Sequence, residues 1–166
     1  LARGGDQAAV VIDGKTQFFG GKSQAVEKHT RVKARVVAHS LREQIESADE
    51  IFIMGHSRED FDSFGASVGV AVMARHLKKP VHVVLSNYTE SIGKITEQFR
   101  KDKTQFYENL FVKMDDLEVP TSLEPLLIVV DTHIPYLTAA PQFLEKMSHV
   151  IVLITTGVVK TLSKTR

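Results

Sequence analysis

Short, largely apolar runs, separated by helix-like stretches, constrain the fold of this chain more than any other feature. The runs are residues 51–54, 81–85, 126–130 and 150–153, and the helix-like stretches are 63–77, 89–101 and 139–147. A short apolar run without polar alternation is typical of a strand buried on both faces. Such strands alternating with helices predict an α/β fold with a doubly wound, mostly parallel sheet, which we expect over residues 49–153.

The segment before residue 49 has a different pattern. Two strand-like stretches, 7–12 and 16–19, flank Asp13-Gly14, a dipeptide suited to a hairpin turn. Because a two-stranded hairpin is not stable alone, we expect residues 1–21 to be the end of a preceding domain. Residues 22–48 carry apolar side chains at helical spacing among basic ones, and they predict an amphipathic connecting helix.

Composition excludes several classes of protein. The 166 residues include no cysteine, which excludes disulfides, thiolate metal sites and cysteine nucleophiles and suits a reducing cytoplasm. The formal net charge of +1 argues neither for nor against an anionic ligand. No apolar run approaches the length of about 20 residues that a membrane-spanning helix needs, so we expect no membrane segment within this chain.

Candidate metal ligands follow two of the predicted strands. His56, Asp60 and Asp62 come after the first strand, and Asp131 follows the third. Because ligands of doubly wound sheets collect at the carboxyl ends of the strands, we expect these side chains to face one crevice. Carboxylates and a neutral imidazole suit Mn²⁺ or Mg²⁺. Two such ions, about 3.5–4 Å apart, could polarise a phosphate and activate a water.

Structural interpretations of the same segment stay open. Asp62 or Ser63 could simply cap the helix that follows, and we expect the side chains of Glu59 and Arg58 to lie in solvent. His133 either supports a metal ligand or is structural. The remaining histidines lie outside the strand-end pattern, and we expect them to be surface or hydrogen-bonded residues: His29, His39, His76, His82 and His149.

Two stretches resemble the first two motifs of the DHH-family phosphoesterases. Residues 54–63, Met-Gly-His-Ser-Arg-Glu-Asp-Phe-Asp-Ser, are similar to the motif His-x-x-x-Asp-x-Asp that precedes a helix of small residues. Residues 129–135, Val-Val-Asp-Thr-His-Ile-Pro, resemble the second motif. Upstream, Leu-Ala-Arg-Gly-Gly-Asp-Gln-Ala at 1–8 and Phe-Phe-Gly-Gly-Lys at 18–22 resemble the junction between a degenerate GGDEF domain and the DHH domain in GdpP-type cyclic-di-AMP phosphodiesterases.

The resemblance implies a two-manganese enzyme, with Mg²⁺ or Co²⁺ as alternative ions, that hydrolyses cyclic-di-AMP to linear pApA. It implies that His56 and Asp60 bind one ion, Asp62 the other and Asp131 both. Asp131 and His133 would take part in catalysis. The partner would be the cyclic dinucleotide; no protein partner is evident, and a homodimer is compatible with the family. The location would be cytoplasmic, as part of a membrane-anchored protein.

The last residues depart from the family's pattern. A third motif, Asp-His-His, would directly follow the strand at 150–153, whereas residues 154–166 read Ile-Thr-Thr-Gly-Val-Val-Lys-Thr-Leu-Ser-Lys-Thr-Arg. A DNA sequence encoding Asp-His-His-Arg-Arg-Gly-Glu-Asp-Phe-Ile-Lys-Asn-Pro can be written that yields this tail when its first base is deleted. We therefore interpret residues 154–166 as an out-of-frame tail and expect it to be poorly ordered. We expect the chain as written to be an inactive fragment.

Two other functions are compatible with these residues. One is a DHH relative that degrades short oligonucleotides (nanoRNA), and the other is a non-catalytic binding domain that keeps part of the fold. An upstream sequence without GGDEF, PAS or membrane segments would favour the first of these. An intact Asp-His-His tail in the genomic DNA would exclude the second.

Overall fold

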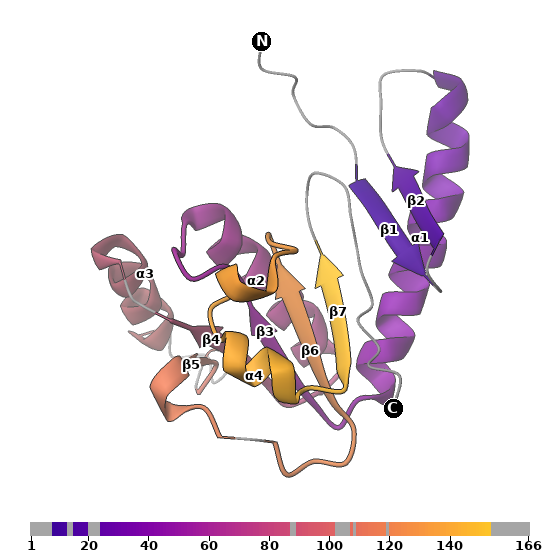
Figure 1. Ribbon diagram of the computed structural model, residues 1–166. Helices are drawn as coiled ribbons and strands as arrows, with labels where there is room; N and C mark the ends of the chain where they lie inside the picture. Colours follow the sequence, from indigo (N-terminus) through magenta and orange to yellow (C-terminus); the bar gives the residue numbers. More distant parts are fainter. Residues whose placement is uncertain are drawn as a thin grey trace.

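The computed structural model (Figure 1) describes residues 8–12, 15–19, 24–86, 89–101, 107, 109–118 and 120–153. Side chains are described from residue 35 onward. The Asp13-Gly14 turn and the predicted out-of-frame tail at 154–166 therefore lie outside the described residues.

The N-terminal part of the described chain is a hairpin followed by a long helix. Strands β1 (Ala8–Ile12) and β2 (Lys15–Phe19) pair antiparallel, as the sequence pattern predicts, and helix α1 (Gln24–Ser47) follows. The hairpin lies beside α1 (Figure 1). Ile45 and Ala48, at the end of this helix, are buried in the core of the main sheet. Among the described residues, no helix is both long and apolar enough to cross a bilayer.

The main sheet has five strands, and every neighbouring pair is parallel. The strands are β3 (Glu50–Met54), β4 (Val81–Leu85), β5 (Phe111–Lys113), β6 (Pro125–Val130) and β7 (His149–Leu153), in the spatial order β5-β4-β3-β6-β7. The predicted doubly wound sheet is thus confirmed. The short edge strand β5 is absent from the sequence prediction.

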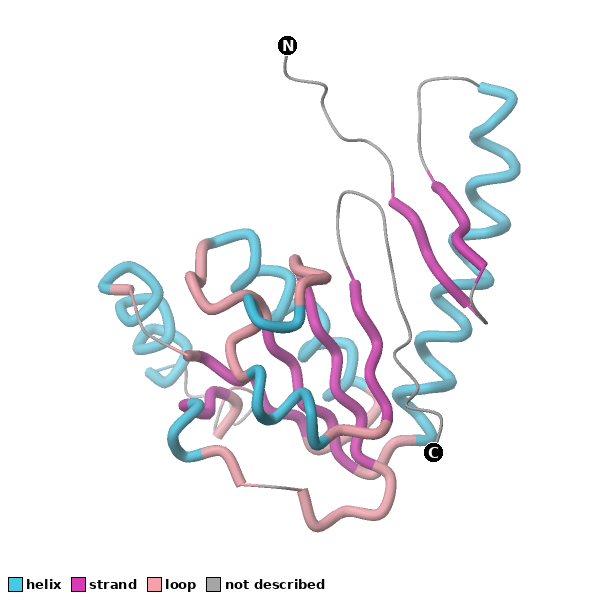
Figure 2. The backbone as a smooth tube through the Cα atoms, in the orientation of Figure 1, coloured by secondary structure: helices cyan, strands magenta, loops and turns pink. Residues whose placement is uncertain are grey.

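Helices cover both faces of this sheet (Figure 2). Helices α2 (Phe61–His76) and α3 (Glu90–Lys101) pack with the end of α1 on one face. Helix α4 (Pro141–Lys146) packs on the other face, together with Leu117, which follows the short 3₁₀ helix η1 (Met114–Asp116). Along β3, Ile51 and Ile53 face the first core and Phe52 and Met54 the second. Double-sided burial explains why the run 51–54 shows no polar alternation.

The order of the strands reverses between β3 and β6. From β3 the chain moves outward through β4 to β5, and it then returns to the other side of β3 to form β6 and β7. In open α/β sheets such a reversal opens a crevice at the carboxyl ends of the two strands, where ligands bind. The crevice here lies between the loop that follows Met54 and the residue that follows Val130.

A glycine allows the end of β3 to approach the first turn of α2. A Cβ atom on Gly55 would lie 1.7 Å from Ser63 Oγ and 3.1 Å from Ser63 Cβ. Any side chain at position 55 would therefore displace the Ser63 hydroxyl and crowd the first turn of α2. This close approach keeps the loop between β3 and α2 short and near the crevice.

Candidate metal centre

The loop between β3 and α2 is held by backbone hydrogen bonds to the segment that follows β6. The Ala139 N–H donates to the Gly55 carbonyl at 2.9 Å, and the Ser57 N–H donates to the Leu137 carbonyl at 2.7 Å. Leu137 belongs to the 3₁₀ helix η2 (Pro135–Leu137). These bonds place His56, between Gly55 and Ser57, beside the segment that leaves β6.

Asp60 caps α2 and faces His56 at the same time. Its Oδ1 accepts the Ser63 N–H at 2.9 Å, which satisfies one of the free donors in the first turn. Its Oδ2 lies 3.4 Å from His56 Nε2. The Ser63 N–H, with a smaller contribution from His56, lowers the pKa of Asp60. The N-cap of α2 is therefore Asp60, and neither Asp62 nor Ser63 has the capping role considered for them.

Asp131 reaches the same imidazole from the other side of the crevice. It is the first residue after β6, its N–H donates to the Leu153 carbonyl on β7 at 2.9 Å, and its Oδ2 lies 3.5 Å from His56 Nε2. Its backbone is left-handed, with φ of 59°. Aspartate and asparagine tolerate this conformation better than most residues.

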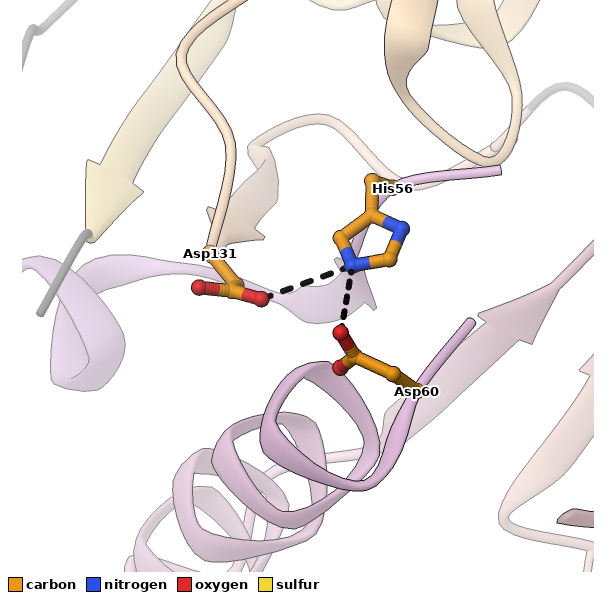
Figure 3. A group of neighbouring side chains, drawn as sticks. All are labelled: His56, Asp60 and Asp131. Atoms are coloured by element: carbon orange, nitrogen blue, oxygen red, sulfur yellow. Dashed lines mark ion pairs between the residues drawn. The ribbon is translucent and has the colours of Figure 1, made fainter. Parts of the chain in front are cut away.

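His56, Asp60 and Asp131 form one group around His56 Nε2 (Figure 3). One ligand atom from each lies within 4.8 Å of the others. The side chain of Asp60 is 58% exposed, whereas those of His56 and Asp131 are 20% and 23% exposed. The group is thus held in the protein on two sides and open to solvent at Asp60.

The electrostatics of this group favour a cation. Partial burial raises the pKa of Asp131, and the negative charges of Asp60 and Asp62 raise it further, while His56 opposes the shift. A divalent ion between the carboxylates would remove that repulsion. Two carboxylate oxygens and one imidazole nitrogen are also a donor set that suits Mn²⁺ or Mg²⁺. The residues present therefore fit a divalent metal ion.

The structure does not bring the other predicted site residues into this group. Asp62 lies in the exposed first turn of α2, where its charge reaches Asp131 but its carboxylate stays outside the cluster. His133 is exposed, two residues beyond Asp131. Metal binding by Asp62 and a catalytic role for His133 therefore stay predictions.

The expectation that Glu59 lies in solvent is wrong. Its side chain is only 5% exposed, and its Oε1 accepts the Ser86 N–H at 2.6 Å. Burial raises the pKa of Glu59 to about 7, against the opposing effects of Ser86 and His56. Its Oε2 is buried and has no hydrogen-bond partner within the described residues. Sequence alone gave no sign of this burial, because it depends on where the end of β4 lies. Arg58, in contrast, is exposed as expected.

The histidines outside the strand ends behave as predicted where their side chains are described. His82 lies 2.9 Å from Glu50 and stacks on Phe52. His39 is exposed beside Glu43, and His76 and His149 are exposed. The side chain of His29 lies outside the described residues.

Comparison of the sequence with known proteins assigns the chain to a family. Residues 50–155 match the family described as "DHH family, N-terminal domain". The chain is 34% identical over 159 residues to the cyclic-di-AMP phosphodiesterase GdpP of Bacillus subtilis (strain 168), covering 92% of this chain and 23% of that protein.

Two further relatives show the same coverage, 92% of this chain and 23% of their own length. They are the cyclic-di-AMP phosphodiesterase GdpP of Geobacillus thermodenitrificans (strain NG80-2), 36% identical over 156 residues, and PdeA of Listeria monocytogenes (serotype 1/2a, strain 10403S), 34% identical over 159. The chain thus spans less than a quarter of the curated relatives it matches. Because the family match at residues 50–155 covers well over half of the chain and contains His56, Asp60 and Asp131, the chain belongs to the DHH family.

Proposed function

We propose that this chain is part of a metal-dependent phosphodiesterase that hydrolyses cyclic-di-AMP to linear pApA. The observation that carries the proposal is the position of His56 Nε2, 3.4 Å from an Asp60 oxygen and 3.5 Å from an Asp131 oxygen, at the reversal of strand order. The names of the relatives favour a cyclic dinucleotide over a short oligonucleotide as substrate. A cytoplasmic location and a homodimer, both implied by the family, belong to this proposal.

Each residue of the group has a defined task in this proposal. His56, Asp60 and Asp131 would hold a divalent ion, with Mn²⁺ as the first choice, and Asp62 would contribute to a second. Such ions supply Lewis-acid polarisation of a phosphate and lower the pKa of a water. His56 must be neutral at Nε2 to bind a metal, so ion binding competes with its protonation. The N-terminal turn of α2, behind Asp60, favours the negative charge of a phosphate.

The domain boundaries and the tail remain part of the proposal. Residues 1–21 would be the end of a GGDEF domain, 22–48 a connecting helix and 49–153 the N-terminal part of the DHH domain. Residues 154–166 would be an out-of-frame tail that replaces the Asp-His-His ligands. Loss of metal ligands weakens both affinity and geometry, so the chain as written should lack phosphodiesterase activity.

Restoring the reading frame tests the proposal. The gene is expressed with the deleted base put back and with the downstream sequence that follows in that frame. The resulting protein should hydrolyse cyclic-di-AMP when Mn²⁺ is present. Asp131→Ala should abolish that activity, whereas Glu97→Ala, which removes an exposed carboxylate on α3, should leave it unchanged. Equal activity in the Asp131 and Glu97 variants would refute the metal site.

Two substrates separate the proposed function from its alternative. The restored protein should cleave cyclic-di-AMP at lower concentration than it cleaves short linear oligonucleotides. A preference for the oligonucleotides would assign the chain to the nanoRNA-degrading relatives. Comparable hydrolysis by the chain as written would show that the tail has no effect on function.

A further inference from the structure

We propose that Glu59 is a positioning residue that fixes the ligand-bearing loop, residues 55–60, on the end of β4. The inference rests on the proposed function in one respect, namely that the positioned side chains, His56 and Asp60, bind a metal ion. Glu59 stands between them in sequence but outside the group that their ligand atoms form with Asp131. Its effect on the ion would therefore pass through the backbone of the loop.

The contact between Glu59 and β4 is direct and short. Ser86 is the first residue after β4, and its N–H donates to Glu59 Oε1 at 2.6 Å. A hydrogen bond to a charged or partly charged carboxylate is stronger than one between neutral groups. The bond joins positions 27 residues apart, so it links two separate parts of the chain.

A second bond between the same two segments is also donated by Ser86. Ser86 Oγ donates to the Ser57 carbonyl at 2.8 Å. The two bonds join Ser86 to the residue after His56 and to the residue before Asp60. With the bonds from Gly55 and Ser57 to the segment after β6, the loop is held from both sides of the crevice.

The burial of Glu59 argues against a role in filling space alone. Burying a carboxylate is costly, and its Oε2 has no partner in the described part of the molecule. An apolar side chain of similar size would occupy the same volume without that cost. What an apolar residue cannot do is accept the Ser86 N–H. A contact that costs stability points to a functional role for the geometry that it imposes. Here the loop held by that contact carries His56 and Asp60, the proposed metal ligands.

The decisive variants are Glu59→Leu and Glu59→Gln in the chain as it stands. Leucine keeps approximate volume but removes the acceptor, whereas glutamine keeps an Oε1 that can accept the Ser86 N–H. Mn²⁺ affinity is measured by the loss of the free-ion electron paramagnetic resonance signal. Hydrogen exchange of the Ser86 amide is measured by NMR without metal. Glu97→Leu is the matched exposed control.

We expect Glu59→Leu to weaken Mn²⁺ binding by roughly 10–100-fold, the effect typical of lost support around metal ligands. The Ser86 amide should exchange at least about tenfold faster, while thermal stability stays close to that of the parent chain, because the loss of the acceptor for the Ser86 N–H and the removal of the buried carboxylate have opposite effects on stability. Glu59→Gln and Glu97→Leu should keep affinity within about threefold, a change of less than one kcal/mol by the usual conversion. A residue with a merely structural role would not separate metal affinity from stability in this way.

Three results would overturn the inference: unchanged Ser86 exchange in Glu59→Leu, unchanged Mn²⁺ affinity in that variant, or equal loss in Glu59→Gln. If Glu59→Leu does not fold by circular dichroism, Glu59→Ala is measured in its place and judged in the same way. If the parent chain binds no measurable Mn²⁺, as loss of the Asp-His-His ligands allows, the same variants are measured in the protein with the reading frame restored. No binding there refutes the metal site of the proposed function, and Ser86 exchange then decides alone whether Glu59 fixes the loop.

Discussion

At the scale of single residues, the site brings acidic groups closer together than their charges favour. The pKa of Asp131 is raised by burial and by its acidic neighbours, while the Ser63 N–H lowers the pKa of Asp60. Glu59 is buried a few residues away with its pKa raised to about 7. Without a cation, ionisation of Asp131 and Glu59 therefore acts against folding, whereas ionisation of Asp60 favours it, and both effects depend on pH.

Glu59 gives a prediction for the metal-free protein. Its pKa is about 7 in the folded chain against an ordinary value of 4.5, so folding favours the protonated form. The stabilisation is complete below the unfolded value and is lost as pH rises through the folded one. In EDTA, the parent chain should lose up to roughly 3 kcal/mol of unfolding free energy through this group between pH 4.5 and pH 8.

The Glu59→Gln variant should lose less unfolding free energy than the parent chain over the same pH interval, because the glutamine amide does not titrate. Urea unfolding at several pH values gives the free energy of unfolding of both proteins. Subtracting one from the other at each pH removes the contributions of the other titratable groups, which the two proteins share. Parallel stability profiles for the two proteins would contradict the raised pKa.

At the scale of elements, strand burial explains which parts of the fold could be predicted from the sequence. The four longer strands of the main sheet are buried on both faces over most of their length and appear as largely apolar runs. Strand β5, Phe111–Lys113, has three residues and ends in an exposed lysine, so its sequence carries too little pattern to recognise. The short helix α4 was predicted, over 139–147, slightly longer than its observed Pro141–Lys146.

The junction of β3 and α2 gives a prediction at this scale. Gly55→Ala places a Cβ atom 1.7 Å from Ser63 Oγ and 3.1 Å from Ser63 Cβ, so the hydroxyl must rotate away and the remaining contact stays tight. We expect a loss of about 1–3 kcal/mol in unfolding free energy, the usual cost of overpacking. Chemical denaturation measures it.

A second substitution checks the cause. Ser63→Ala removes the hydroxyl and leaves the Cβ contact at 3.1 Å, so it should recover part of the loss in the double variant. Strict additivity of the two single effects would show that the clash is not the reason.

At the scale of the whole molecule, topology explains how much of the site could be predicted. His56 and Asp60 come from one loop and Asp131 from a segment far from it in sequence, yet parallel strands place their carboxyl ends at one edge of the sheet. The burial of Glu59 could not be predicted, because it depends on the contact of one loop with the end of a different strand. The convergence of the metal-ligand candidates could be predicted because it follows from strand direction. The burial of Glu59 follows from tertiary packing instead.

Metal binding gives the prediction for the whole molecule. An ion that binds only the folded chain stabilises it, by about 1.4 kcal/mol at a tenfold excess over Kd. Mn²⁺ should therefore raise the Tm of the parent chain, and EDTA should reverse the effect. Asp131→Asn should lose the Mn²⁺-dependent rise while keeping the backbone conformation, because asparagine also tolerates positive φ. Differential scanning calorimetry with and without Mn²⁺ measures this; an equal rise in the variant would place the ion elsewhere.

The reversal of strand order also divides the molecule into two halves that meet along β3 and β6. The first half, β3 to β5, carries His56 and Asp60, and the second, β6 and β7, carries Asp131. The connection between them includes the 3₁₀ helix η1 and the exposed Leu123. Two polypeptides produced by a cut in this connection should therefore reassociate, and Mn²⁺ should promote their union because neither piece holds the complete ligand group. Binding of Mn²⁺ would then show that the two polypeptides have reassociated, because only the reassembled molecule contains all three ligand side chains.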